Sequence, residues 1–338
     1  MPATPAPAPA TRPALSPRLS EAVDRLHLDP LGPAALVDGA RITADTVPGL
    51  RHALANKLYE VLHAGLGPSR GPRPRTLRDE AYETLLAQAV PHRETVVRVP
   101  TAAVREASDD AHRTVLLDGV RTLVPKRLLS DGLGRDEVTV RYPCARPALS
   151  AGFFLVDGSP GRPVGTDTVR LYVHIEDSGA APGIWRRLLL RLEAATVPYR
   201  AKVSSSPLLY PRRDAAVVYL DAAHGGEELA GEAAAAVAGR PGLGAGTSVF
   251  AREIAPGLAL AAEPDDPRKG LSHMSFGQHR AHAVAQGLVD HALAPDAADK
   301  HTAVVRALTR ARIRPDEPWR NTPRPAPAPD RPQPHTPA

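Results

Sequence analysis

Residues 169–176 (VRLYVHIE) alternate apolar and polar side chains without a break, and this segment constrains the fold more than any other. Because successive side chains of a strand point to opposite faces of a sheet, the alternation predicts a β-strand with one apolar and one polar face. The polar face carries Arg170, Tyr172, His174 and Glu176, spaced about 6.6 Å apart. Two interpretations remain open: a half-solvated strand, or the floor of a polar cleft.

A second strand, residues 199–204 (YRAKVS), follows a predicted helix at 182–196 that begins with Pro182. A helix of this length between two strands favours a crossover that lays them parallel. Lys202 would then project on the same side as His174. The chain has only five lysines, and Lys202 is the one in the middle of a strand. Because a semi-buried lysine is costly unless paired, it needs a partner or a task.

The wider pattern predicts an α+β fold. Leucines recur every four residues between 50 and 62, which is typical of a helix, and short strand-like runs occur between 94 and 130. From residue 138 onward, strands alternate with helices. We therefore predict a mainly helical N-terminal region at 18–135 and a mixed α/β domain at 136–313.

Proline gathers at both ends of the chain. Fifteen of the 37 prolines lie within residues 2–17 and 315–337. Such segments favour polyproline II and cannot bury a core. We expect disordered tails at 1–17 and 314–338, either as passive solvated segments or as docking segments for a partner.

Composition excludes several classes of function. Cys144 is the single cysteine, so neither an intrachain disulfide nor a CxxC-type zinc site is possible, and we expect no metal. No apolar run approaches the roughly 18 residues of a membrane helix, and the N-terminus lacks the apolar stretch of a signal peptide. Aromatic residues make up only 4%, too few for base-stacking platforms. We expect a cytoplasmic protein with no membrane or nucleic-acid partner.

Three arginines outside the first strand are candidate anion ligands. Arg212 and Arg213 stand between Pro211 and an apolar strand, either as a charged turn or as a guanidinium fork for phosphate. Ser275 and Gln278 have the spacing of a capping box. Arg280 falls near the first turn of that helix, where a basic side chain is unfavourable to the helix dipole and therefore suggests a bound anion or an ion pair. The alternative there is a plain capped helix with exposed charges.

Taken together, residues 169–176, the following helix, VPYRAKVSSSPLLYPRRDAAVVYL, APGLALAAEP and SFGQHRAHAVAQGL resemble the C-terminal half of the HopA-type type III effector family. The resemblance covers about residues 138–295. Bacterial members of that family occur beside a separate phosphotransferase-like kinase in class V lanthipeptide and thioamitide pathways. The resemblance implies a phosphoserine/phosphothreonine lyase, a carbon–oxygen lyase that eliminates phosphate from a phosphorylated precursor peptide to leave dehydroalanine or dehydrobutyrine.

The order of elements is also similar to the lyase domain of class III and IV lanthipeptide synthetases and to the phosphothreonine lyases. Those proteins carry a K-x-H strand in which lysine is the base and histidine the acid, and a second lysine follows after a helix. Here His174 matches the histidine and Lys202 the second lysine, but Tyr172 replaces the first lysine.

The resemblance implies site roles that leave one choice open. Lys202 is the base, or Lys202 stabilises the enolate while Tyr172 is the base. His174 is the general acid. Arg213 and Arg280 bind the phosphate, helped by Arg170 and Arg212, because arginine offers bidentate contacts to phosphate.

The implied chemistry needs no cofactor. The implied partners are the phosphorylated precursor peptide, the kinase and a cyclase. Two rival functions remain open: a non-catalytic phosphopeptide-binding scaffold for the kinase, and an effector that acts on a host phosphoprotein.

Overall fold

A computed structural model of the chain describes residues 14–28, 34–67, 76–117, 119–132, 136–165, 167–271 and 273–323. Within these residues, helices and antiparallel sheets are mixed, which confirms the α+β class. None of the described helices has the length and apolar character needed to cross a membrane.

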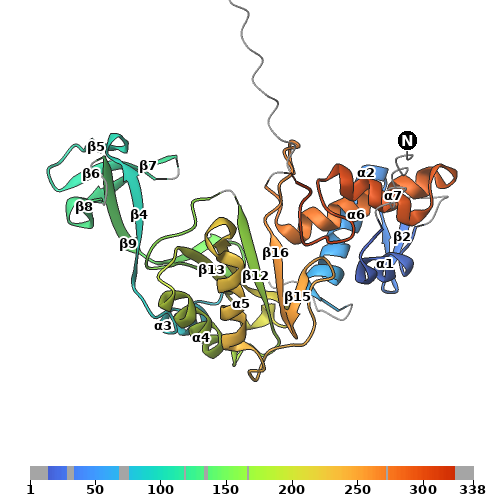
Figure 1. The fold of residues 1–338 in the computed structure, drawn as a ribbon, viewed down its shortest axis with the longest axis horizontal. Helices are drawn as coiled ribbons and strands as arrows, with labels where there is room; N and C mark the ends of the chain where they lie inside the picture. The colour runs from blue at the N-terminus through green and yellow to red at the C-terminus, as the bar shows by residue number, and fades with distance from the viewer. Residues whose placement is uncertain are drawn as a thin grey trace, which may run out of the picture.

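A seven-stranded sheet lies at the centre of the molecule (Figure 1). Its strand order is β10-β11-β13-β14-β12-β16-β15, and every neighbouring pair is antiparallel. The strands are β10 (Ala145–Ser150), β11 (Phe153–Asp157), β12 (Thr168–Ile175), β13 (Tyr199–Ser204), β14 (Arg212–Asp221), β15 (Arg252–Ala255) and β16 (Leu258–Ala262).

Strands β12 and β13 run parallel to each other, as the crossover argument predicts, but they are not neighbours. Strand β14 lies between them and pairs antiparallel with both. In the register, Lys202 lies opposite Val217, and Val217 lies opposite Tyr172. Directly opposed residues share a face of a sheet, so Lys202 and the polar side chains of β12 do lie on one face, two strands apart.

The other face of the sheet is apolar and covered by helices. Helices α3 (Glu80–Gln88), α4 (Ala181–Ala194) and α5 (Gly226–Val237) pack against it (Figure 1). Trp185 and Leu188 of α4 are fully buried against Leu171 and Val173 of β12. The apolar half of the alternating segment therefore forms the main core.

A second group of helices covers the β12, β14 and β16 part of the polar face. It consists of α2 (Val47–Leu58), the π-helical segment η1 (Tyr59–Ala64), α6 (Phe276–Leu293) and α7 (Lys300–Arg310). The leucines of α2 are buried against Phe276 and Val284 of α6. Gly65 ends η1 at φ 71°, the left-handed conformation that glycine adopts readily at a helix end.

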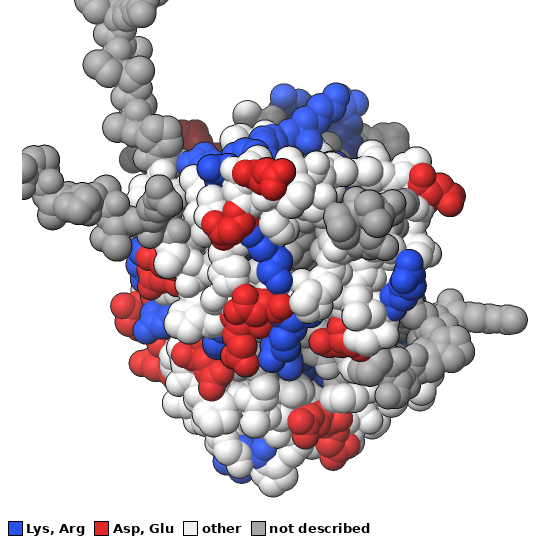
Figure 2. Space-filling model, turned by 90° about the vertical axis from the view of Figure 1, so that its right-hand side faces the viewer, with Lys and Arg blue, Asp and Glu red and all other residues white. Residues whose placement is uncertain are grey.

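The N-terminal segment packs onto the same group. It comprises α1 (Pro17–Asp24) and a small sheet of β1 (His27–Leu28), β2 (Ala34–Val37) and β3 (Ala40–Thr43). Figure 2 shows this end of the molecule, where acidic and basic side chains are interspersed over much of the face. Surface pairs such as Arg310–Asp290, at 2.6 Å, fit this distribution and add little stability individually.

A separate β-module projects from the body at the left of Figure 1. One of its sheets has the order β4-β9-β8 and the other β5-β6-β7. Its strands are β4 (Glu94–Pro100), β5 (Val104–Glu106), β6 (His112–Leu117), β7 (Val120–Pro125), β8 (Leu129–Asp131) and β9 (Glu137–Pro143). Val99, Val115, Val124 and Val140 form a small core of its own.

Two boundary predictions need correction. The region 18–135 is not mainly helical, because the β1–β3 sheet and the β-module occupy much of it. The strand-like runs between 94 and 130 do form strands, and pairing with β9, which lies beyond residue 135, completes the module. The tails are also shorter than predicted. Pro17 begins α1, the Ser16 amide donates to Pro315 O at 2.9 Å, and Trp319 is buried. The predicted disorder of 1–13 and 324–338 falls outside the described residues.

Candidate functional site

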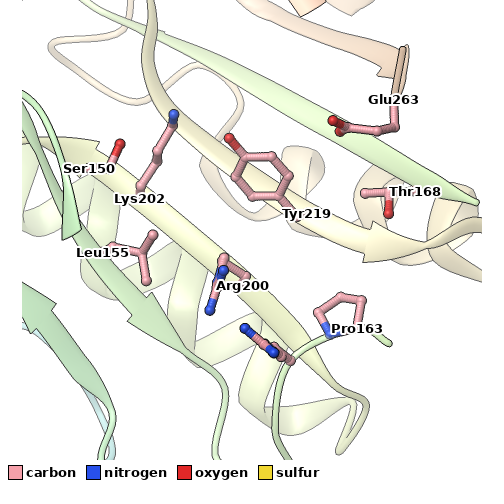
Figure 3. A pocket seen from close by; sticks show the side chains of 9 residues that line it. Ser150, Leu155, Pro163, Thr168, Arg200, Lys202, Tyr219 and Glu263 are labelled. Carbon is pink, nitrogen blue, oxygen red and sulfur yellow. The ribbon is translucent and has the colours of Figure 1, made fainter. Parts of the chain in front are cut away.

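A cavity of about 350 Å³ opens on the polar face of the central sheet, beside the covering helices. Strand β13 supplies Arg200 and Lys202, β14 supplies Tyr219, and Glu263 follows β16. Figure 3 shows the Lys202 side chain and the Tyr219 ring side by side, with the Glu263 carboxylate on the far side of the ring. The full lining is Ser150, Leu155, Arg162, Pro163, Thr168, Arg200, Lys202, Tyr219 and Glu263.

Lys202 has an unusual environment for a lysine. Its ammonium lies 4.2 Å from the centre of the Phe153 ring and 5.8 Å from that of Tyr219. Within the described part of the chain, Lys202 makes neither a hydrogen bond nor an ion pair. Aromatic faces attract a cation but leave all three of its N–H donors available. The side chain is therefore held in place while its nitrogen remains available to a ligand.

The two arginines of the lining add positive charge. Arg200 donates from Nε and Nη2 to the two carboxylate oxygens of the fully buried Asp157, at 2.6 and 3.1 Å. Arg162 approaches from the loop before β12. Among the lining residues, three are cations and Glu263 is the one carboxylate. The cavity therefore favours an anionic ligand.

Glu263 lines the cavity and forms a tight ion pair with Arg170, which lies outside the lining. Arg170 donates from Nε and Nη2 to the two carboxylate oxygens at 2.6 and 2.5 Å. Burial by itself would lower the pKa of Arg170, but Tyr172, Tyr219 and Glu263 outweigh it and raise that pKa above its usual value. The guanidinium also lies 5.0 Å from the centre of the Tyr219 ring. Arg170 therefore supports the cavity from behind rather than lining it.

Tyr172 lies in the core beneath the covering helices, not in the cavity. It is 4% exposed, and its hydroxyl accepts a hydrogen bond from Arg170 Nη1 at 3.3 Å. The His63 ring meets it edge-on at 5.0 Å. Burial raises the pKa of the Tyr172 phenol well above its usual value. The structure thus removes Tyr172 from contact with a ligand in the cavity.

Arg212 is committed to a buried network with Asp214 and Tyr59. It donates to Asp214 at 2.8 and 2.9 Å and to the Tyr59 hydroxyl at 3.0 Å. Burial would raise the pKa of Asp214, but the Arg212 guanidinium outweighs it and holds the pKa well below the usual range. The turn that carries the predicted guanidinium fork therefore uses Arg212 to anchor η1 to β14.

His174 and Arg213 lie together at a different corner of the polar face. His174 Nδ1 lies 2.9 Å from Gly246 O, so this nitrogen donates to the carbonyl and Nε2 remains an acceptor. Burial lowers the pKa of His174. Arg213 donates to Val61 O at 3.3 Å and has no carboxylate partner among the residues that the structure describes. From strand geometry, the Cα atoms of His174 and Lys202 are roughly 12 Å apart.

Arg280 is fully buried and connects α6 to the C-terminal segment of the chain. It donates to Pro318 O at 3.1 Å and to Asn321 Oδ1 at 2.8 Å. Burial lowers its pKa to about 9. The capping box predicted at Ser275 and Gln278 is confirmed, with α6 beginning at Phe276. The Arg280 guanidinium therefore makes its hydrogen bonds within the protein.

The structure thus separates the seven predicted site residues. Lys202 lines the cavity, and His174 and Arg213 share a second corner. Arg170, Tyr172, Arg212 and Arg280 are bonded to protein partners outside the cavity lining. Sequence reasoning missed Tyr219, Arg200 and Glu263 as lining residues. The alternation of residues 199–204 places Arg200 on the same face as Lys202, so the sequence carries a signal for this residue. Nothing local marked Glu263, which meets Arg170 across 93 residues of chain.

The described residues contain no group of three histidine, cysteine or acidic side chains that could hold a metal ion. The fold and the cavity define an α+β protein with an anion-attracting pocket on one face of an antiparallel sheet. A family model, the HopA1 effector protein family, matches residues 144–320. That match spans more than half of the chain, and the protein therefore belongs to the HopA1 effector protein family.

Two solved structures are similar to this chain. One is an effector protein from Pseudomonas syringae pv. tomato strain DC3000, at 15% identity and a TM-score of 0.47. The other is an effector protein from Pseudomonas syringae pv. syringae strain 61, at 15% identity and a TM-score of 0.43. Each match covers 81% of this chain and 96% of the other. A comparison with curated proteins found no match.

Proposed function

We propose that this protein is a lyase that eliminates phosphate from phosphoserine or phosphothreonine of a peptide. The sequence resemblance supplies the biosynthetic setting: a cytoplasmic kinase phosphorylates a ribosomal precursor peptide of the lanthipeptide or thioamitide type, and the lyase leaves dehydroalanine or dehydrobutyrine, on which a cyclase then acts. The observation that carries the proposal is the Lys202 ammonium, which faces an anion-attracting cavity and has no ion-pair partner in the described chain.

The reaction assigns a task to each lining group. Lys202 first gives up one ammonium proton to solvent and then takes the Cα proton of the phosphorylated residue. The Cα–Cβ double bond forms as the Cβ–O bond breaks, and phosphate leaves with the electron pair of that bond. Arg200 and Arg162 offset the charge on phosphate, since preorganised cations stabilise charge that develops in a transition state. The Tyr219 hydroxyl is placed to donate a proton or a hydrogen bond to a phosphate oxygen.

The buried residues keep supporting roles in this scheme. Lys202 is the proposed base, because the Tyr172 phenol is enclosed by protein and its pKa is raised. His174 remains a candidate acid only for a substrate that reaches from the cavity to the Gly246 corner. Arg213 would then contact a second anionic group of the same peptide.

A direct assay tests the proposal. The purified protein is incubated with a synthetic peptide that contains one phosphothreonine, and mass spectrometry follows the loss of phosphoric acid. Lys202→Met should lower the rate by about 10²–10⁴-fold, the usual contribution of a general base. Lys269→Met is the matched control, because Lys269 is exposed and lies outside the cavity lining. Wild-type activity in Lys202→Met, with folding verified by circular dichroism, would refute the assignment.

The separation of His174 from Lys202 favours a second candidate, a phosphopeptide-binding scaffold for the kinase. A scaffold needs cations to bind the phosphate, but it does not need a base and an acid that reach the same residue of the peptide. Binding of the phosphothreonine peptide without any change of its mass would support this function. An effector acting on a host phosphoprotein would share the chemistry and differ in its substrate.

A further inference from the structure

The β-module offers a surface that the proposed lyase reaction does not use. One face of its β5-β6-β7 sheet packs on the module core, where Val115 is fully buried. The opposite face is open to solvent. The cross-strand register places Arg105, Thr114 and Leu123 side by side, and Leu116 opposite Arg121. These five residues are called the Arg/Leu face below.

The Arg/Leu face exposes two large apolar side chains to solvent. Leu116 is 47% exposed and Leu123 is 56% exposed, although both belong to regular strands. Large apolar side chains grouped on an open sheet face are typical of an interaction surface. Arg105 and Arg121 are exposed beside them, and the described residues of these strands place no carboxylate on this face. The charge complement of this surface is therefore an acidic segment with apolar side chains.

The module is attached at the rim of the cavity. Strand β9 leads through Cys144 into β10, whose second residue, Arg146, pairs with the lining residue Leu155. At the foot of the other connecting strand, β4, Thr95 donates to Gly158 O at 2.6 Å. The carbonyl of Val96 lies against Gly161, the neighbour of the lining residue Arg162. A peptide held in the cavity therefore has the module within reach.

We propose that the Arg/Leu face binds an acidic, leucine-type segment of the same peptide substrate, at a distance from the residue that reacts. This inference rests on the proposed lyase function. The seven residues of β4 span roughly 23 Å at the rise of a strand. An extended peptide covers that distance in about seven or eight residues. The docking segment and the phosphorylated residue should be separated by about this length.

The first experiment measures binding without chemistry. The probe is a fluorescein-labelled, unphosphorylated peptide of alternating glutamate and leucine, followed by fluorescence anisotropy. We expect saturable binding to the full chain and at least tenfold weaker binding to the Arg105→Glu/Arg121→Glu double variant. A lysine/leucine version of the probe should prefer that variant. The matched control is Arg186→Glu/Arg187→Glu, which changes two exposed arginines of α4 on the other side of the sheet.

The second experiment tests the spacing. Two phosphothreonine peptides carry the glutamate/leucine segment either eight or two residues from the phosphothreonine. The eight-residue spacing should lower KM with kcat unchanged, and the Arg105→Glu/Arg121→Glu variant should abolish that advantage. An absence of elimination from either peptide would refute the lyase function, while the anisotropy result would still decide whether the face binds acidic peptide.

Three outcomes would overturn the docking proposal. The first is equal binding of the probe to the wild type and to the Arg105→Glu/Arg121→Glu variant. The second is binding only to vesicles that contain anionic lipid, which would make the Arg/Leu face a membrane contact. The third is elimination that does not depend on the glutamate/leucine segment or its spacing, which would support the lyase function and refute the docking surface.

Discussion

Acidification should destabilise the fold through a histidine buried in its neutral form. His63 belongs to η1 and is only 3% exposed. Its Nδ1 lies 2.9 Å from Ser248 Oγ, and burial lowers its pKa to about 4. An unfolded histidine has a pKa of about 6.5. Between these two values the unfolded chain binds a proton that the folded chain does not, so stability falls as pH is lowered from 6.5 towards 4.

The size of the loss follows from the shift. Each pKa unit corresponds to about 1.4 kcal/mol, so at pH 4.5 His63 should reduce the free energy of unfolding by about 2–3 kcal/mol relative to pH 8. Asp214 does not contribute in this window, because its pKa is lowered in the folded state and its stabilisation is lost only below the usual carboxylate range. His279 is a second source, since burial lowers its pKa also to about 4.

Urea unfolding followed by circular dichroism at pH 8, 6 and 4.5 measures this loss. His63→Gln removes the titration and keeps an amide that can bond Ser248, so its loss between pH 8 and 4.5 should be smaller than in wild type by about 2–3 kcal/mol. His224→Gln is the control, because His224 is an exposed surface side chain. An equal loss in wild type and His63→Gln would refute the reasoning.

Three further outcomes can be measured with single variants. Gly277→Ala should lower the free energy of unfolding by about 1–3 kcal/mol, since a Cβ there would lie 2.2 Å from His63 Cδ2 in a packed core; a neutral result in urea titration would contradict this. Asn321→Ala should raise KM for the phosphopeptide several-fold, because Asn321 Nδ2 holds Glu263 O at 2.6 Å; an unchanged KM would show that the cavity wall does not depend on this bond. Tyr172→Phe should retain elimination within a few-fold, since Tyr172 is buried outside the cavity; loss of elimination in a folded variant would restore Tyr172 as the base.

The strand pattern predicted the part of the site that depends on local geometry. The alternation in β12 and β13 placed Arg170, Tyr172, Lys202 and Arg200 on one face, and the structure confirms that arrangement. It could not show which part of that face is open. The covering comes from η1 and α6, which are distant in sequence, and they bury the β12 side while leaving the β13 side beside a cavity.

The roles of the arginines were the least predictable feature. A guanidinium is a phosphate ligand or a structural cation according to its partners, and those partners are far away in the chain. Arg280 bonds Asn321, 41 residues later, and Arg212 bonds Tyr59, 153 residues earlier. Lysine carried a clearer signal, because Lys202 is the one lysine in the middle of a strand of the central sheet and has no anionic partner among the described residues.

A double-mutant cycle distinguishes the two roles for Arg170. If Arg170 acts by holding Glu263, Arg170→Gln should raise KM in the wild-type background and have little further effect in Glu263→Gln, because the interaction it serves is already lost. If Arg170 instead binds phosphate directly, Arg170→Gln should raise KM by the same factor in both backgrounds. Inhibition by inorganic phosphate supplies a second readout: its inhibition constant should change for Arg200→Gln, which lines the cavity, more than for Arg170→Gln, which lies behind the wall. If Arg170→Gln changes the inhibition constant more than Arg200→Gln does, and the effects in the cycle are additive, Arg170 binds phosphate directly.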